Sequence, residues 1–253
     1  MKPLFSIITV TYNAQESLPT TIRSVDAQTF TDYEHIIQDG NSKDRTVEIA
    51  ELADPARRRI VSAPDKGLYD AMNKAMSIAS GKYLIFLNAG DSFHDSETLR
   101  RMADLITEND YPGVVYGQTD LVDIDGKYLA PRHLTAPENL TYRDFANGML
   151  VCHQAFCALA RIAPRYDTRY RLSADYDWCI KCLQHSRRNV YLPGTMIDYL
   201  YEGMSTKNRR KSLIERFRIM SHYYGFFPTL LRHLSFIPRF FSHKKTISNA
   251  VRQ

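Results

Sequence analysis

The strongest constraint on the fold is a regular alternation of strand-like and helix-like segments over the first 120 residues. Residues 4–11, 33–39, 58–63 and 82–87 are short runs with the apolar and β-branched side chains that are typical of buried strands. Residues 67–80 space their apolar side chains three and four apart, as amphipathic helices do. The alternation predicts an α/β fold with a mostly parallel sheet and helices on both faces.

The chain is less regular after residue 120. The DIDG stretch at 123–126 predicts a hairpin turn, and residues 175–184 predict a further helix. Neither an internal repeat nor a long linker separates the two halves. We therefore expect the second half to pack on the first.

Residues 207–253 differ in charge from the rest of the chain. They contain eleven Lys and Arg residues and one acid, whereas residues 1–206 contain 22 basic and 27 acidic residues. One helical side of this tail carries Leu213, Phe217, Met220, Tyr224 and Phe227. The pattern favours a basic amphipathic segment that lies on a membrane surface; the alternative is a terminal helix packed on the body with a solvated basic face. The acidic body offers no basic groove, which argues against nucleic acid as a partner.

The composition excludes several classes of protein. The chain has no run of about 18 uncharged apolar residues, so no transmembrane helix is predicted. Residues 1–10 lack the features of a secretory signal, and a cytoplasmic location is expected. Four cysteines are too few for a disulfide scaffold. Cys179 and Cys182 lie one turn apart in a predicted helix, and we favour buried thiols over a zinc site.

Polar residues follow each of the four predicted strands; they are Tyr12, Asn13, Asp39, Asp65 and Asp91. In a parallel sheet these strand ends meet at one edge, so we expect an acidic crevice there. The chain has no glycine-rich phosphate-binding motif, so a nucleoside diphosphate would need a divalent metal, for which Asp91 is the best-placed ligand. Taken singly, Asp39 fits a turn, and Asp44 and Asp65 fit helix caps.

Five motifs occur in an order that resembles family 2 inverting glycosyltransferases. They are SIITVTYN at 6–13, DGNSKDRT at 39–46, PDKGLYDAMNKAM at 64–76, YLIFLNAGD at 83–91 and ADYDW at 174–178. The likeness is greatest to bacterial enzymes of capsule, exopolysaccharide and O-antigen assembly. The resemblance, which covers about residues 4–205, implies a GT-A fold in which residues 1–120 bind the nucleotide sugar and residues 121–206 hold the acceptor and the catalytic base. Residues 207–253 are the basic tail described above.

The resemblance also assigns the donor site. The residues that it implies for the nucleotide are Thr11, Tyr12, Asn13, Asp39, Asp65 and Asn73. Among these, Asp39 would accept a hydrogen bond from the base, while Asp65 and Asn73 would frame the ribose and the donor sugar. The family's metal motif usually contains two acids; here Asp91 remains as the acid that would hold Mg²⁺ or Mn²⁺, and Asn88 can add a carbonyl oxygen.

On the acceptor side, the resemblance implies that Asp175 is the catalytic base, which deprotonates the attacking hydroxyl. Asp177 would be either an acceptor ligand or a charge on the helix surface. His153 would either contact the acceptor or the pyrophosphate, or be a core histidine with its hydrogen bonds satisfied. Residues 201–205 also resemble a stretch that borders the active site in this family.

We therefore expect a metal-dependent, inverting hexosyl- or N-acetylhexosaminyltransferase that uses a nucleoside-diphosphate sugar, with a lean toward UDP. A glycan acceptor carried on a polyprenyl diphosphate, and attachment to the inner face of the cell membrane, would suit the basic tail and bacterial surface polysaccharide biosynthesis. The rival hypothesis is a non-catalytic subunit that binds a nucleotide sugar or a lipid-linked glycan, because Asn88 and Gly90 stand where the family's metal motif has acids.

Overall fold

The computed structural model describes residues 2–52, 57–201 and 209–234. Its centre is one nine-stranded sheet with the order β3-β2-β1-β4-β8-β6-β9-β5, and β7 pairs with β6 beside this path. The strands are β1 (Phe5–Thr11), β2 (Tyr33–Asp39), β3 (Arg58–Ser62), β4 (Tyr83–Phe86), β5 (Ser92–Phe93), β6 (Val114–Val122), β7 (Tyr128–Pro131), β8 (Phe156–Leu159) and β9 (Asn189–Leu200). The four strands predicted in the first 90 residues are thereby confirmed.

The sheet is mixed, and its N-terminal half is parallel. Strands β3, β2, β1 and β4 run in the same direction, so their carboxyl ends share one edge. Strand β8 lies antiparallel between β4 and β6. It therefore separates β6 from the parallel strands β1 to β4. Strand β6 pairs parallel with β9 and antiparallel with β7 through the predicted turn at 123–126. The division expected at residue 120 falls inside β6, so both halves share this sheet.

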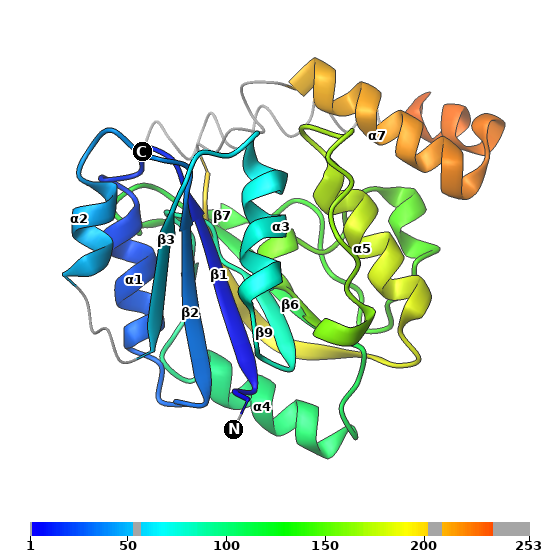
Figure 1. Ribbon diagram of the computed structural model, residues 1–253. Coiled ribbons are helices and arrows are strands. Elements are labelled where there is room, and N and C mark those ends of the chain that lie inside the picture. The colour runs from blue at the N-terminus through cyan, green and yellow to red at the C-terminus, as the bar shows by residue number, and fades with distance from the viewer. Residues whose placement is uncertain (1, 53–56, 202–208, 235–253) are drawn as a thin grey trace.

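Helices cover both faces of the sheet (Figure 1). They are α1 (Leu18–Asp26), α2 (Thr46–Glu51), α3 (Leu68–Ile78), α4 (Thr98–Glu108), α5 (Ala174–His185) and α7 (Arg209–Tyr224). The crossovers β1-α1-β2 and β3-α3-β4 run in opposite directions along the sheet, and right-handed crossovers then place α1 and α3 on opposite faces. The expected α/β fold is confirmed.

Helix α7 belongs to the folded body, although the sequence placed it in a separate tail. Ile219 and Met220 are buried in the main hydrophobic core, and Glu215 accepts hydrogen bonds from the backbone N–H groups of Arg171 (3.0 Å) and Leu172 (2.8 Å). On the expected apolar side, Met220 is buried and Leu213 is 46% exposed. Residues 226–234 continue as a helix after Gly225, and residues 207–208 and 235–253 of the expected tail lie outside the described residues.

The four cysteines are free and buried, as predicted. Within the described ranges, no helix is long and apolar enough to cross a membrane.

Candidate active site

Asp39 joins the carboxyl ends of the first three strands. Its carboxylate is fully buried and accepts hydrogen bonds from Thr11 Oγ1 (3.0 Å), Ser62 Oγ (2.7 Å) and the Ser42 backbone N–H (2.9 Å), and also from the Ser42 hydroxyl. Burial raises the pKa of Asp39, but these hydrogen bonds outweigh burial and hold the pKa below its usual value. A carboxylate accepts about four hydrogen bonds, so these donors occupy the group that was expected to face the base.

Three of the predicted nucleotide residues meet beside Asp39. A Cβ atom added to Gly40 would lie 2.5 Å from Asp65 Oδ2 and 3.3 Å from the Tyr12 ring, so both side chains border this glycine. The Tyr12 side chain is 65% exposed and free to stack on a ligand. Asn13 has a φ of 50°, and its Oδ1 accepts a hydrogen bond from the Lys43 backbone N–H at 2.9 Å, which ties the loops after β1 and β2 together.

The alternative roles of Asp44 and Asp65 are also present in the structure. Asp44 Oδ1 accepts a hydrogen bond from the Thr46 backbone N–H at 3.0 Å, at the start of α2. Asp65 Oδ1 accepts one from the Gly67 backbone N–H at 2.7 Å, just before α3. Asp65 thus orders its loop with one oxygen, while its other oxygen faces Gly40.

Asn73 is bound to another part of the protein. Its amide donates to the Tyr166 carbonyl oxygen at 3.0 Å and accepts from the Tyr166 backbone N–H at 2.8 Å. This two-way contact attaches α3 to the loop before α5. Both polar atoms of the side chain that was expected to frame the ribose are used in this attachment.

Asp91 lies in a buried turn after β4. Its carboxylate accepts hydrogen bonds from Gln154 Nε2 (2.8 Å) and the Leu200 backbone N–H (2.9 Å), and burial raises its pKa to about 7. The preceding Gly90 has a φ of 101°, and a Cβ there would lie 2.5 Å from a methyl group of Leu200. The turn therefore requires glycine, since both the backbone conformation and the space exclude a larger residue.

The turn also fits a cation. Asp91 is 3% exposed, and its contacts are an amide and a backbone N–H, neither of which carries the positive charge that a buried carboxylate usually requires. Asn88 Oδ1, from the same turn, is buried and has no hydrogen-bond partner among the described residues. An unpaired carbonyl oxygen and a buried carboxylate are both ligands that Mg²⁺ and Mn²⁺ accept.

Asp175 lies in the first turn of α5 and is partly exposed. The Tyr69 hydroxyl on α3 donates a hydrogen bond to Asp175 Oδ1 at 3.0 Å, and burial raises the pKa of Tyr69 well above its usual value, with a further rise caused by the Asp175 charge. Burial also raises the pKa of Cys152, Arg132 lowers it, and both Asp91 and Asp175 raise it. The charges of Asp91, the predicted metal ligand, and Asp175, the predicted base, thus both act on the Cys152 thiol.

Asp177 and His153 are core residues. Asp177 is 4% exposed; it accepts a hydrogen bond from the Tyr223 hydroxyl at 2.8 Å and pairs with Lys181 Nζ at 2.6 Å. His153 Nε2 lies 2.7 Å from the Tyr166 hydroxyl, its ring stacks on Phe86, and burial lowers its pKa to about 4. The contacts of His153 match the core alternative, and those of Asp177 match neither of the roles that we considered for it.

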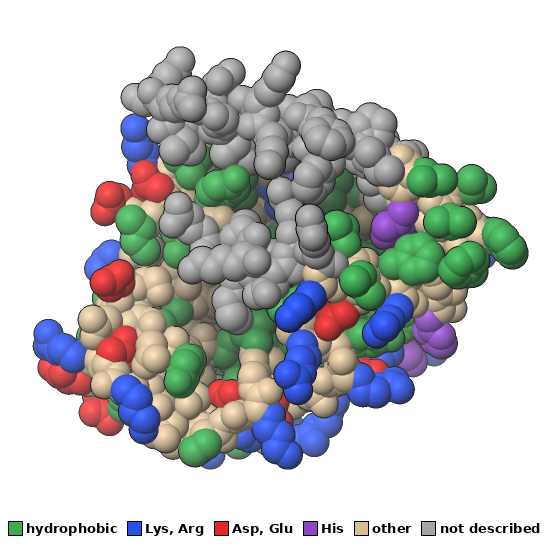
Figure 2. All heavy atoms as spheres, turned by 90° about the horizontal axis from the view of Figure 1, so that it is seen from above, with side chains coloured by type: hydrophobic (Ala, Val, Ile, Leu, Met, Phe, Trp, Pro, Cys, Tyr) green, Lys and Arg blue, Asp and Glu red, His purple; other side chains and the backbone are tan. Residues whose placement is uncertain are grey.

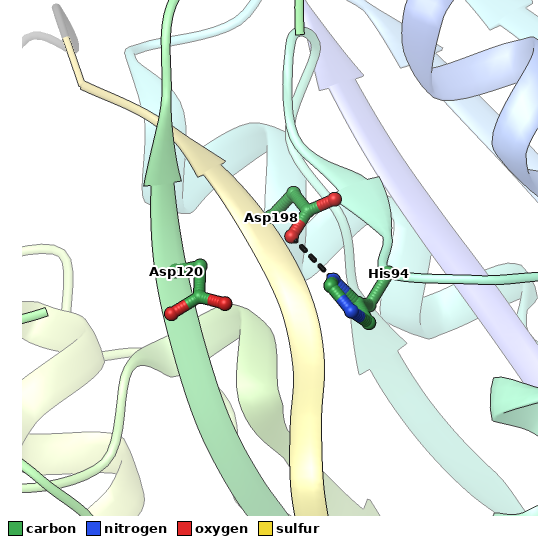
Figure 3. A group of neighbouring side chains, drawn as sticks. All are labelled: His94, Asp120 and Asp198. Carbon is green, nitrogen blue, oxygen red and sulfur yellow. Dashed lines mark hydrogen bonds and ion pairs between the residues drawn. The ribbon is translucent and has the colours of Figure 1, made fainter. Parts of the chain in front are cut away.

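A second group of metal-ligating side chains lies on β6, β9 and the segment after β5 (Figure 3). His94, Asp120 and Asp198 each offer a ligand atom, and these atoms lie within 4.8 Å of one another. His94 Nδ1 pairs with Asp198 Oδ1 at 2.8 Å, and Asp120 Oδ2 accepts a hydrogen bond from Thr195 Oγ1 at 2.9 Å. No motif in the sequence indicates this group, because its members come from three separate segments.

Ligands of open α/β sheets bind at the carboxyl ends of the parallel strands, which is where these acidic, partly buried residues lie. The chain belongs to glycosyltransferase family 2: the model described as "Glycosyl transferase family 2" matches residues 6–163. A PGL/p-HBAD biosynthesis glycosyltransferase of Mycobacterium tuberculosis is 34% identical over 190 residues, which cover 72% of this chain and 71% of the relative.

Other proteins are similar either to part of this sequence or to its fold. The Escherichia coli enzyme WfgD, named UDP-Glc:alpha-D-GlcNAc-diphosphoundecaprenol beta-1,3-glucosyltransferase, is 29% identical over 136 residues, 52% of this chain and 53% of that protein. Among solved structures, Staphylococcus aureus TarS with UDP-GlcNAc matches with a TM-score of 0.71 at 18% identity, over 92% of this chain and 73% of that one. The Pyrobaculum calidifontis mannosyltransferase PcManGT, with GDP-Man and Mn²⁺, matches with a TM-score of 0.61 at 15% identity, over 94% and 76%. The fold is GT-A-like, and the chain is a nucleotide-sugar-dependent glycosyltransferase.

Proposed function

We propose that this protein is an inverting glycosyltransferase that transfers a hexose or N-acetylhexosamine from a UDP-sugar to a lipid-linked glycan in bacterial surface polysaccharide biosynthesis. The observation that carries the proposal is the position of Asp175. It is partly exposed, it is oriented by the Tyr69 hydroxyl, and its charge, like that of Asp91, raises the pKa of Cys152. A general base on one side of the site and a leaving-group turn on the other are the parts that an inverting transfer needs.

The chemical step follows from these positions. Asp175 takes the proton of the acceptor hydroxyl as its oxygen bonds to the anomeric carbon of the donor sugar. The bond from that carbon to the diphosphate oxygen breaks on the opposite side, and its electron pair leaves with the nucleoside diphosphate. Attack and departure on opposite faces invert the anomeric configuration.

The turn after β4 is proposed to hold the divalent metal. Asp91 and the unpaired Asn88 Oδ1 would be its protein ligands, with diphosphate oxygens and water completing the shell. When bound, Mg²⁺ or Mn²⁺ would neutralise charge on the departing diphosphate. Gln154 and the Leu200 backbone hold the Asp91 carboxylate in place for this role.

The nucleotide is proposed to lie along the edge formed by β1, β2 and β3. Tyr12 offers an exposed ring, and Asp65 directs one oxygen toward Gly40 beside it. Asp39, together with Thr11, orders this edge through buried hydrogen bonds, and Asn13 fixes the loop that carries Tyr12. Asn73 supports the edge through its attachment to Tyr166. The names of WfgD and of the TarS complex, which both specify UDP-sugars, favour uridine as the base.

An apolar surface beside the site supports a membrane-bound acceptor. Large apolar side chains are exposed on α7 and on residues 226–234; they are Leu213, Ile214, Phe226, Phe227, Leu230, Leu231 and Leu234. Figure 2 views the molecule from the carboxyl edge of the sheet, and hydrophobic side chains gather at the right of this view. Residues 207–253 are also strongly basic. Together these features suit the inner face of the cell membrane, where anionic headgroups attract basic segments.

The test is a transfer assay with a panel of nucleotide sugars, preceded by thermal melts with UDP, GDP, CDP and dTDP in the presence of Mn²⁺. We expect UDP to raise the melting temperature and the Asp175→Asn variant to bind UDP but to lose transfer by about 10²-fold or more. Asp104→Asn, on the exposed side of α4, is the matched control. Wild-type binding of UDP without transfer to any acceptor would favour the non-catalytic binding subunit instead.

A further inference from the structure

The face of α7 that packs on α5 carries a cation. Ser212 and Tyr223 anchor this face: the hydroxyls of Ser212 and Ser173 lie 3.0 Å apart, and the Tyr223 hydroxyl donates to Asp177 at 2.8 Å. Arg216 lies between these anchors, four residues after Ser212, so it occupies the same side of the helix. Its side chain therefore starts from the surface that contacts the helix of the proposed base.

The Arg216 guanidinium has no protein partner among the described residues. Its Nε is buried and makes no hydrogen bond, and the described part of the chain provides neither a hydrogen bond nor an ion pair to its other nitrogens. Ser212 and Glu215 contact the residues just before α5, so Arg216 lies at the end of α5 that carries Asp175, and its charge lowers the pKa of Tyr69, which burial and Asp175 otherwise raise. A buried donor that lacks an acceptor is costly, unless a ligand supplies the acceptor.

A second guanidinium, that of Arg132, is held by residues 149–150, in a segment on which α5 packs through Tyr176 and Trp178. Arg132 donates hydrogen bonds to the carbonyl oxygens of Leu134 (2.9 Å), Leu150 (3.1 Å) and Met149 (2.6 Å), so its position is fixed before any ligand binds. Burial lowers the pKa of Arg132 and the charge of Arg216 lowers it further, while Asp175 raises it. The charges of Arg132 and Arg216 repel each other, and a multivalent anion would offset that repulsion.

We propose that Arg216 and Arg132 bind a diphosphate group beside Asp175. Guanidinium groups match phosphate oxygens in geometry and keep their charge in buried sites. The inference rests on the proposed function, because that function brings two diphosphates to the site: the one in the donor and the one that links a polyprenyl chain to the acceptor. In the turn after β4, Asp91 is the single acid, and the two arginines would add positive charge toward the diphosphate beside whatever the turn binds.

The test measures the affinity of inorganic pyrophosphate by calorimetry, in the absence of membranes. We expect Arg216→Gln to weaken binding about tenfold or more and Arg216→Lys to weaken it less, since lysine keeps the charge but loses the planar fork. Arg218→Gln removes the same charge from an exposed position of the same helix and should change the affinity less than twofold. Thermal melts of each variant show whether it is folded.

UDP and farnesyl diphosphate distinguish the two sources of the group. Weaker UDP binding by Arg216→Gln assigns the site to the donor, and weaker farnesyl diphosphate binding assigns it to the acceptor. Unchanged affinity of folded Arg216→Gln for all three probes would overturn the proposal. So would an equal loss in Arg218→Gln, or a wild-type protein that binds none of the probes. The proposed function fails on a different result, the absence of sugar transfer by the wild-type enzyme.

Discussion

The Tyr69 hydroxyl donates a hydrogen bond to Asp175 Oδ1 across 106 residues of sequence, at 3.0 Å. This bond joins α3, which begins beside the proposed nucleotide edge, to α5, which carries the proposed base. Tyr69 itself is 5% exposed. Tyr69 is therefore a positioning residue. It orients the Asp175 carboxylate but is too buried to contact the acceptor.

Tyr69→Phe should therefore lower kcat and leave the KM of the donor nearly unchanged. Loss of one hydrogen bond corresponds to about 0.5–1.5 kcal/mol, so kcat should fall about three- to tenfold. Steady-state kinetics with the donor varied at saturating acceptor measure this split. A rise in donor KM with an unchanged kcat would show that Tyr69 serves donor binding instead.

The two candidate metal sites differ in which aspartate variant should weaken Mn²⁺ binding. Asp91→Asn should weaken Mn²⁺ binding in the presence of UDP by about tenfold or more, because a charged ligand becomes neutral. Asp198→Asn is the matched control, since it changes the His94–Asp198 pair and leaves the turn after β4 intact. Electron paramagnetic resonance titration of Mn²⁺ measures both affinities. If Asp198→Asn alone weakens binding, the metal belongs to the His94, Asp120 and Asp198 group, and our assignment to Asp91 is wrong.

Acid should destabilise the protein through His35. Its Nδ1 accepts a hydrogen bond from Arg58 Nε (3.3 Å) and its Nε2 lies 2.9 Å from Thr9 Oγ1; burial, and then the Arg58 charge, lower its pKa to about 3. Below the unfolded pKa of about 6.5 the unfolded chain binds the proton first, so the free energy of unfolding falls by about 1.4 kcal/mol per pH unit as pH drops toward 3.

His35→Gln should remove this contribution and flatten the profile between pH 6.5 and pH 4.5. Urea unfolding at several pH values measures the slope, and His185→Gln, at an exposed position of α5, is the control. Asp91 acts in the opposite sense, because its raised pKa of about 7 favours the folded state at low pH. The difference between variant and wild type isolates His35, and equal slopes in the two proteins would refute its role.

The exposed apolar surface should bind vesicles that contain anionic lipid. Phe227 and Leu231 are 75% and 68% exposed, so replacing both with Ser should leave the free energy of unfolding within about 0.5 kcal/mol. Binding to phosphatidylglycerol vesicles should fall about tenfold or more, because two large side chains no longer enter the interface. Leu52→Ser, at an equally exposed position just after α2, is the control in a flotation assay. Undiminished flotation of the double variant would exclude this surface as the membrane contact.

Local patterns predicted much of the fold, and long-range pairing accounts for what they missed. The strands near Ile8, Ile36 and Ile85 could be predicted because each is a short segment centred on apolar or β-branched side chains. Strand β9 could not, because Pro193 and Gly194 interrupt it, and the structure accommodates them with a register shift against β6. The insertion of β8 between β4 and β6 depends on residues that are far apart in the chain, and no local periodicity encodes such a pairing.

The same distinction holds for the candidate site. Asp91 and Asp175 could be proposed because each stands in a short motif at the end of a strand or the start of a helix. The contacts of Asn73 and Asp177 could not be predicted, since their partners lie 93 and 46 residues away. Arg132 and Arg216 were missed for a related reason: a lone arginine in a basic sequence does not indicate whether it faces solvent or the site.

The attachment of α7 to α5 has a geometric consequence for the acceptor. Glu215 and Tyr223 bind the first turn of α5 and the residues just before it, so the exposed apolar surface and Asp175 move as one body. A bilayer that receives this surface would also set the height of the carboxylate above the lipid. The enzyme would then select acceptors by length, that is, by the number of sugars between the lipid diphosphate and the reacting hydroxyl.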